Sequence, residues 1–159
     1  MVRYGNARDL DDVMKMLDQC IIEMHVRKLN IWDRNYPTRE IILDDLNSGK
    51  SIVYEEDNKV VAFLVYYPMK TDKYEKYYEN HQNYCLVQRV MSHPQYRRQG
   101  HAKSILQFVE TLGFDSIRLL TRNTNTYSVT LYTKLGYKVV KEDYLKDVVM
   151  QACEKILKK

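Results

Sequence analysis

Apolar residues recur along this chain at two different spacings, which predict its helices and its strands. Over residues 10–24 they follow one another at three- and four-residue intervals, and this period predicts an amphipathic helix over about 9–29. A second helix is expected over 38–48, because Thr38 can cap its first turn and Ser48-Gly49 can end its last.

Two further helices are expected in the second half of the chain. One leaves a basic turn near residue 100 and runs to about Gly113, and the other spans 126–135 and ends at Gly136. The tyrosine-rich stretch 69–83 is polar, and we expect a long exposed loop or a ragged helix there. Residues 147–157 fit either a helix or a last strand, because their apolar residues include several β-branched ones.

Shorter runs of β-branched and aromatic residues predict the strands. The strongest signal is a hairpin, in which two apolar runs flank the turn-type dipeptide Asp57-Asn58. The expected strands are 2–7, 51–55, 60–67, 86–91, 116–120 and one that begins over 137–140. Strands interleaved with helices, without repeats or linkers, predict one domain over 1–159 of the α/β or α+β class with a mixed sheet.

Composition narrows the class of protein. The chain is 45% hydrophobic and 29% charged, as in an ordinary globular domain, and no apolar run approaches the roughly 18 residues of a membrane span. The N-terminus does not resemble a signal peptide. Its cysteines, Cys20, Cys85 and Cys153, lack metal-ligand spacing and fit buried thiols in a reducing cytoplasm. We therefore expect a cytoplasmic protein without a metal site or a membrane partner.

Charge is unevenly distributed along the chain. Residues 80–141 hold nine Lys or Arg against only Glu110 and Asp115, a net charge of +7, whereas the remainder is at about −3. Such a block suits a polyanion, either nucleic acid or a multiply phosphorylated cofactor, although a solvated basic face is an equal alternative on charge alone.

The basic turn 95–103 lies between an expected strand and an expected helix. Gly100 lets the backbone approach a ligand closely, and the helix start supplies amide donors and a partial positive charge. Both features favour a phosphate group.

Three segments together resemble the GNAT acyltransferase superfamily. Arg97, Gly100 and Ala102 match its R/Q-x-x-G-x-G/A loop, and His93-Pro94 resembles the "HP" pair that precedes this loop. The segment 125–137 resembles the family's N-x-x-A-x-x-x-Y-x-x-x-G-F pattern. The resemblance implies a mixed, mostly antiparallel twisted sheet of about six to seven strands with about four helices, and an acetyl-coenzyme-A-dependent N-acetyltransferase.

The resemblance also implies roles for the matching residues. The loop amides would bind the coenzyme A pyrophosphate, with charge from Arg97, Arg98 and Lys103, and the preceding strand would pair with the pantetheine amides. Asn125 would orient a pantetheine amide or cap the fourth helix. The implied cofactor-binding residues are Val90, Met91, Ser92, Arg97, Arg98, Gln99, Gly100, His101, Ala102, Lys103 and Asn125.

Tyr132 is the implied catalytic residue, as an acid that protonates the departing coenzyme A sulfur. A phenol has an ordinary pKa of about 10, close to that of an alkyl thiol, so the transfer is nearly balanced. The alternative is a core tyrosine in an amphipathic helix.

The acceptor side is less defined. No carboxylate stands in the strand before the loop, and a water relay is as plausible a base as the scattered candidates, which are Glu23, His25, His81, His93 and Glu142. Trp32 and Tyr36-Pro37 resemble a W-x-x-x-Y-P segment of small bacterial GNAT proteins. An aromatic wall would suit a cationic amine. The tentative acceptor-binding residues are Trp32, Tyr36, Tyr66 and Tyr84.

Acetyl-coenzyme A and an amine are therefore the expected partners of a monomer or homodimer, with no nucleic acid. The amine would belong to a small molecule or a peptide, and it would attack directly within a ternary complex. The alternative function is a non-catalytic module of the same fold that binds coenzyme A or an acyl form as a sensor.

Overall fold

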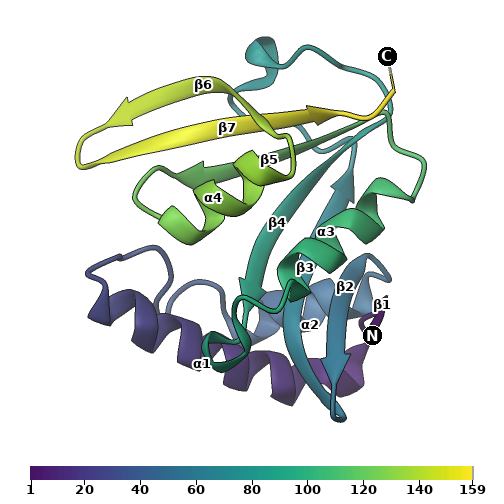
Figure 1. Cartoon of the computed structure of the whole chain (residues 1–159), viewed down its shortest axis with the longest axis vertical. Coiled ribbons are helices and arrows are strands. Elements are labelled where there is room, and N and C mark those ends of the chain that lie inside the picture. Colours follow the sequence, from purple (N-terminus) through teal and green to yellow (C-terminus); the bar gives the residue numbers. More distant parts are fainter. Residues whose placement is uncertain (159) are drawn as a thin grey trace. The chain divides into compact units, whose positions relative to one another are not determined.

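The computed structural model describes residues 1–158, which form a seven-stranded sheet and four α-helices (Figure 1). The strands are β1 (Val2–Tyr4), β2 (Ser51–Glu56), β3 (Lys59–Pro68), β4 (Tyr84–Ser92), β5 (Ser116–Arg122), β6 (Lys138–Leu145) and β7 (Val148–Ile156). The helices are α1 (Leu10–Val26), α2 (Arg39–Asn47), α3 (His101–Glu110) and α4 (Thr126–Lys134).

The sheet is mixed, with the strand order β1-β2-β3-β4-β5-β7-β6. Strands β4 and β5 pair in parallel, whereas β1–β2, β2–β3, β5–β7 and β6–β7 are antiparallel. The expected mixed α/β architecture with four helices is therefore confirmed. The hairpin between β2 and β3 turns at Asp57 and Asn58, whose φ values of 51° and 65° are those of a two-residue type I′ turn.

The chain divides into two compact units. The first contains Met1–Val65 and Arg89–Val109, and the second contains Tyr66–Gln88 and the residues from Glu110 onward. Strands β3 and β4 each contribute residues to both.

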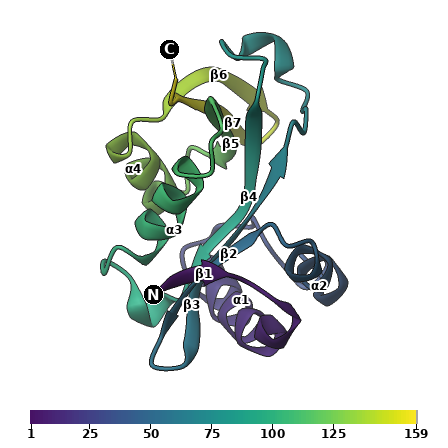
Figure 2. The ribbon, with the colours of Figure 1, turned by 90° about the vertical axis from the view of Figure 1, so that its right-hand side faces the viewer.

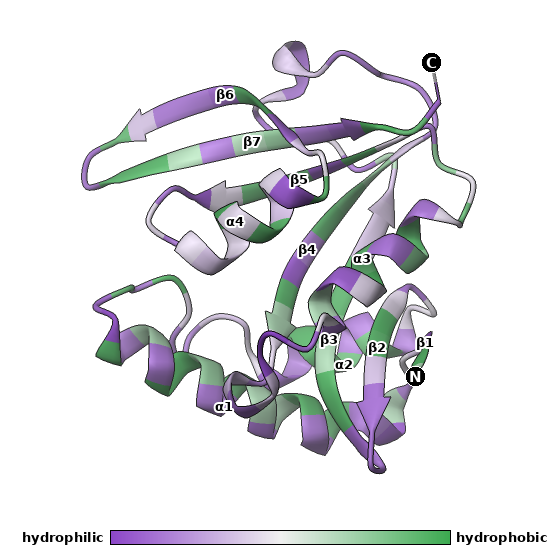
Figure 3. Cartoon of the chain, viewed as in Figure 1, coloured by the Kyte–Doolittle hydropathy of each residue, from purple (hydrophilic) through white to green (hydrophobic). Residues whose placement is uncertain are grey.

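In the first unit, helices lie on both faces of the strands. Helices α1 and α2 cover one face of β1–β3, and α3 lies on the opposite face (Figure 2). Hydrophobic and hydrophilic residues alternate along α1, and its buried stripe includes Val13, Leu17 and Cys20 (Figure 3). Thr38 caps α2 as expected, because its hydroxyl accepts the Ile41 amide at 3.2 Å.

In the second unit, most of the stretch 69–83 is exposed and contains one short 3-10 turn, Glu75–Tyr77, as expected, but two of its tyrosines are buried. Tyr74 and Tyr78 are each only 3% exposed and pack against Ala152 of β7. The fully buried guanidinium of Arg118 lies 4.0 Å from the Tyr78 ring centroid and 3.5 Å from that of Tyr84. Most of the stretch faces water, whereas the buried tyrosines are held by their hydroxyls, which donate to Asp143 and Asp72 at 2.7 and 2.8 Å.

The C-terminal segment is a strand, which settles its predicted ambiguity. Strand β7 pairs with β5 from Ile156 to Met150 and with β6 on its other edge. Pairing on both edges satisfies the backbone N–H and C=O groups of β7. The β-branched residues of this segment also favour a strand over a helix. Helices α1 and α3 each end three residues before the expected ends near Leu29 and Gly113.

Candidate functional site

The C-terminal end of β4 contains a backbone irregularity directly before the predicted coenzyme-binding strand residues. Arg89 has a φ of 54°, in the left-handed region that a non-glycine residue rarely adopts within a strand. Val90, Met91 and Ser92 follow it. Within the first unit, this end of β4 neighbours β3 on one edge only, and the His93 amide donates to the Val61 carbonyl at 2.8 Å.

Arg89 is held by a buried carboxylate. Its Nε and Nη2 donate to the two carboxylate oxygens of Asp45 on α2 at 2.7 and 2.8 Å, and the two side chains are only 7% and 3% exposed. Burial disfavours the charge of Arg89, but the hydrogen bonds and the charge of Asp45 outweigh this effect and raise the pKa of the guanidinium above its ordinary value. The planar, two-point contact fixes the side chain direction.

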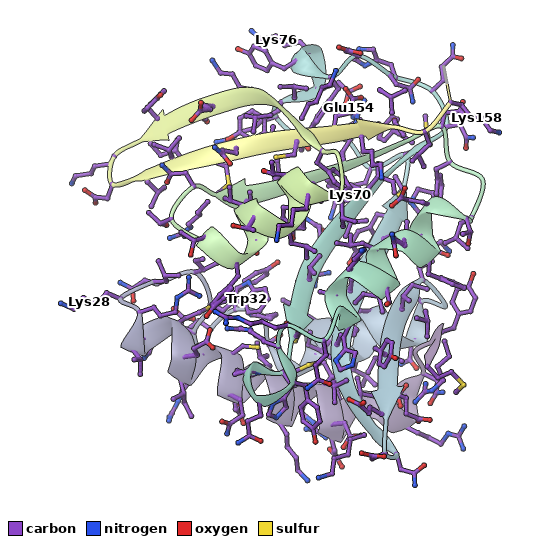
Figure 4. All side chains as sticks on the ribbon, viewed as in Figure 1. Lys28, Trp32, Lys70, Lys76, Glu154 and Lys158 are labelled. Carbon is purple, nitrogen blue, oxygen red and sulfur yellow. The ribbon has the colours of Figure 1, made fainter. Side chains whose placement is uncertain are left out.

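Arg89 also reaches the segment between α1 and α2. Its Nη1 donates to the Tyr36 hydroxyl at 2.9 Å. Tyr36 closes a turn in which Asp33 Oδ1 accepts the amides of Asn35 and Tyr36 at 2.7 and 3.2 Å. Figure 4 shows Trp32 on the same segment. The structure therefore brings Trp32 and Tyr36 onto one turn, with Tyr36 43% exposed.

The other two tentative acceptor residues lie elsewhere, in the second unit. Tyr66 is 8% exposed and meets Phe114 edge-on, with ring centroids 5.8 Å apart. Tyr84 is 2% exposed beneath Arg118. Both rings are occupied by packing within their own unit and present little surface to a ligand.

The predicted phosphate loop follows β4 and is anchored at its start. The His93 ring caps the 3-10 turn Pro94–Tyr96, because its Nδ1 accepts the Gln95 amide at 3.2 Å. The Arg97 guanidinium pairs with Glu23 of α1, which also lies 3.5 Å from Arg27. The side chain of Arg97 therefore fastens the loop to α1, a role that sequence reasoning missed.

His101 also points inward. Its side chain is 4% exposed, and its ring lies 4.2 Å from the Tyr54 ring at an interplanar angle of 33°. Nε2 is 3.4 Å from a Glu56 carboxylate oxygen. Burial lowers the pKa of His101, and the opposing effect of Glu56 does not cancel it. His101 can serve a ligand at the loop only through its backbone.

The exposed part of the loop retains the features of an anion site. Arg98 and Gly100 have φ values of 63° and 78°, and a Cβ placed on Gly100 would have no atom within 4 Å. Ser104 is the first residue of α3 whose amide has an acceptor, the Gly100 carbonyl at 2.9 Å. The amides of 101–103 have no acceptor within the helix and are oriented for an anion, with the exposed Arg98 and Lys103 beside them.

Tyr132 lies in the second unit, on α4, and is 5% exposed. Burial raises its pKa well above the ordinary value, whereas the Ser128 hydroxyl acts in the opposite direction without outweighing burial. The phenol is therefore protonated at neutral pH, as an acid must be. Its ring centroid is 5.8 Å from that of Tyr137, whose buried hydroxyl has no hydrogen-bond partner among residues 1–158.

Asn125 precedes α4 but does not cap it through its side chain. Asn125 therefore occupies the N-cap position of α4 without a side-chain capping bond. Its backbone carbonyl accepts the Val129 amide at 3.0 Å, as the first bond of the helix.

Two of the scattered base candidates are already engaged. Glu23 pairs with Arg97 and Arg27, and the His81 Nδ1 lies 2.9 Å from Glu75, which itself pairs with Arg118. Over residues 1–158, no cluster of three or more His, Cys, Asp or Glu side chains is arranged to hold a metal ion. None of the helices in that range has the length and apolarity to cross a membrane.

The chain is similar to known proteins both in sequence and in fold. A model described as the acetyltransferase (GNAT) family matches residues 16–137. A search of curated proteins finds no match. Among solved structures, the chain is similar to a GNAT-family acetyltransferase from Streptococcus agalactiae 2603, with 26% identity, a TM-score of 0.86, and coverage of 100% of this chain and 96% of that one.

Two other similar structures contain the coenzyme. PaiA N-acetyltransferase from Thermoplasma acidophilum, in complex with coenzyme A, is 16% identical, with a TM-score of 0.76 and 98% of each chain covered. YncA from Salmonella typhimurium, with its cofactor acetyl-CoA, is 14% identical, with a TM-score of 0.75 and coverage of 100% of this chain and 94% of that one. At these identities the likeness shows the fold.

We predict that Asp45→Asn destabilises the first unit and loosens the Trp32 turn. The substitution leaves the buried Arg89 charge without its carboxylate, a loss that costs about 3 kcal/mol or more of unfolding free energy. Trp32 is the single tryptophan of the chain, so its emission reports on this turn directly. Urea unfolding should show the lower stability, and acrylamide quenching of Trp32 should increase.

Asp44→Asn is the matched control, because Asp44 is the neighbouring acid on α2 and is exposed. Its stability and quenching should equal those of the unaltered protein. Equal stability of the Asp45 and Asp44 variants would show that the Arg89 pair does not hold this region.

Proposed function

Because the chain belongs to the acetyltransferase (GNAT) family and is an acyltransferase, we propose that it moves an acetyl group from acetyl-coenzyme A to a primary amine. The amine belongs to a small molecule or a peptide. The reaction is a direct attack within a ternary complex, with no covalent enzyme intermediate.

The loop after β4 is the observation that carries this proposal. Its exposed glycine, the amides of the first turn of α3 and the exposed side chains of Arg98 and Lys103 together suit a pyrophosphate. The loop starts at an anchored residue, Arg97, so its amides are held before a ligand arrives. Preorganised donors cost little free energy on binding.

We assign binding of the pantetheine arm and of the acetyl carbonyl of acetyl-coenzyme A to the C-terminal end of β4. Val90, Met91 and Ser92 form an edge segment within the first unit, and an edge offers backbone groups for an added strand-like ligand. We assign the polarisation of the thioester carbonyl to a backbone amide near Met91. The left-handed residue Arg89 interrupts the regular strand directly before these amides and so changes their direction.

Tyr132 is assigned the role of general acid. The neutral amine nitrogen bonds to the thioester carbon, and the tetrahedral intermediate then collapses with cleavage of the carbon–sulfur bond. The sulfur takes the Tyr132 proton, the nitrogen releases a proton to solvent, and the Tyr132 phenolate then regains a proton from solvent. The phenol is protonated at neutral pH, as this role requires, but burial raises its pKa above that of an alkyl thiol, so the transfer is less balanced than with an exposed phenol.

Trp32 and Tyr36 are assigned to the acceptor side. Both lie on the turn between α1 and α2, and Tyr36 is exposed while its hydroxyl stays bonded to Arg89. A cationic amine gains from an aromatic face by about 0.5–1 kcal/mol at an exposed site. That contribution favours amines generally and does not select one.

A thiol-release assay tests the function. Acetyl-coenzyme A is incubated with the protein and with polyamines, amino acids, aminoglycosides and peptide N-termini, and released coenzyme A is measured with a thiol reagent. At least one primary amine should give acceptor-dependent release, and mass spectrometry should find the acetylated amine. Coenzyme A binding without release for any amine would favour a sensor module.

Tyr132→Phe should lower kcat by about 100-fold or more, as expected for loss of a general acid. Binding of coenzyme A, measured by calorimetry, should change less than threefold because only one hydroxyl is removed. Tyr137→Phe is the matched control, since Tyr137 is also buried and its hydroxyl is unbonded within the described residues. A kcat of Tyr132→Phe equal to that of the control would remove the acid role.

Gly100→Val should abolish detectable coenzyme A binding. A β-branched residue at a φ of 78° is strained and shifts the loop backbone. Gly49→Val is the matched control, because Gly49 has a φ of 74° and equally open space around it. Both variants should lose similar stability in thermal unfolding, but only the Gly100 variant should lose calorimetric binding; if both variants bind normally, the loop assignment is wrong.

A further inference from the structure

A cavity of about 170 Å³, lined by both polar and apolar residues, opens beside the start of the phosphate loop, entirely within the first unit. It is formed by α1, the start of β3 and the 3-10 turn that follows β4. The polar residues that line it are Asp12, Lys15, Lys59, His93, Gln95 and Tyr96. None of them belongs to the exposed glycine turn assigned to the coenzyme.

The lysines of this cavity lack counterions. Lys15 and Lys59 are exposed and have no ion pair or side-chain hydrogen bond with any residue from 1 to 158. The single carboxylate, Asp12, has one oxygen committed to the Val60 amide at 3.2 Å. At neutral pH, two ammonium groups therefore face one carboxylate, a net charge of +1 across the lining.

The histidine adds a neutral donor. Nδ1 of His93 accepts the Gln95 amide, so the ring proton resides on Nε2. Burial lowers the pKa of His93, with further lowering by Lys59 and Arg97, and the ring is therefore uncharged at pH 7. Its orientation is fixed by Tyr96, whose ring meets it edge-on at 5.3 Å.

Size limits the ligand. The cavity has room for several water molecules or one small ion. Drug-sized ligands need about 300 Å³ or more. Two ammonium groups beside one carboxylate repel a divalent cation and attract a small anion.

We propose that this cavity binds a small oxyanion, such as phosphate, sulfate or a short carboxylate, between Lys15 of α1, Lys59 of β3 and His93. The anion joins three elements that are also linked by Asp12, by the bond from His93 to Val61 and, just after the 3-10 turn, by the pair of Arg97 with Glu23 of α1. The site is separate from the amides at the start of α3.

Occupancy has a consequence for the loop, and this consequence alone depends on the proposed function. The residues that line the cavity run directly into Arg97, which begins the phosphate loop. An anion held by the 3-10 turn restrains the loop start and leaves less conformational entropy to be lost when coenzyme A binds. Coenzyme A affinity should therefore rise about threefold to tenfold with the anion present.

The test uses the full chain and inorganic phosphate as the probe, in HEPES at constant ionic strength. Nitrogen–proton correlation spectra are recorded during titration with phosphate, with sulfate and then with acetate. The amides of 59–61, 93, 95 and 96 should shift together with one saturating curve. The comparison of tetrahedral phosphate and sulfate with planar acetate identifies the anion geometry that the cavity prefers.

A double variant, Lys15→Met with Lys59→Met, should weaken this binding at least tenfold. Lys28→Met with Lys146→Met is the charge-matched control, because both lysines are exposed and neither has an ion-pair partner among the described residues. Figure 4 shows Lys28 pointing away from the protein. The spectra also show whether each variant is folded.

Coenzyme A distinguishes the cavity from the loop. Saturating coenzyme A should leave phosphate shifts at 59–61 in place, whereas phosphate bound at 100–103 would be displaced. Shifts confined to 100–103, or equal binding by the two double variants, would overturn the proposal, as would no shift at tens of millimolar phosphate. If coenzyme A does not bind at all, the proposed function fails while the shifts at 59–61 still decide the anion site.

Discussion

The contact between Arg89 and Asp45 is the constraint on which the donor side of this protein depends. A left-handed residue costs about 1–2 kcal/mol relative to an extended one, so β4 would relax if nothing opposed it. Relaxation would withdraw the guanidinium from a carboxylate that is itself buried, and an unpaired buried charge costs about 3–5 kcal/mol. Losing the pair costs more free energy than keeping the left-handed conformation of Arg89. That conformation is therefore fixed, and it sets the direction of the backbone that follows over Val90–Ser92. The same guanidinium holds Tyr36, so one side chain connects the strand to the aromatic turn.

In the loop that follows β4, some basic residues attach the loop to the rest of the first unit and others are exposed to solvent. Arg97 pairs with Glu23 and His101 stacks on Tyr54, so two residues of the family-like loop are occupied in its attachment to α1 and β2. Arg98 and Lys103 remain exposed beside the helix start. In the proposed function, attraction of a pyrophosphate would then rest mainly on the amides of the helix start, which are placed by attachment and not by flexible side chains. A loop built this way loses affinity when its attachment is loosened, even at residues that never touch the ligand.

Local patterns in the sequence predict most of the fold and the location of the loop. The Asp57-Asn58 turn, the Thr38 cap and the helical periods are properties of short segments, and the structure confirms them. Contacts between distant segments are not visible in such patterns. Arg89 meets Asp45 across 44 residues, and Arg118 meets Glu75 across 43. The polar composition of 69–83 fits its largely exposed residues, but it does not reveal that Tyr78 is covered by the buried Arg118 or that Tyr74 packs near Ala152. In the same way, nothing in the composition of α1 marks Glu23 as the partner of Arg97.

The structure also bears on where the amine loses its proton. Glu23 would have to leave two guanidinium groups to reach a substrate proton, and His81 is bonded to Glu75. The Nδ1 lone pair of His93 is taken by the Gln95 amide, and its other nitrogen carries the proton. Strand β4 itself contributes no carboxylate. The other two candidates, His25 and Glu142, are exposed. We propose that solvent takes the proton, with these two side chains as the alternative bases, and that the enzyme contributes through Met91 and Tyr132 at the thioester. Catalysis would then come mainly from placing the two reactants together and from protonating the sulfur.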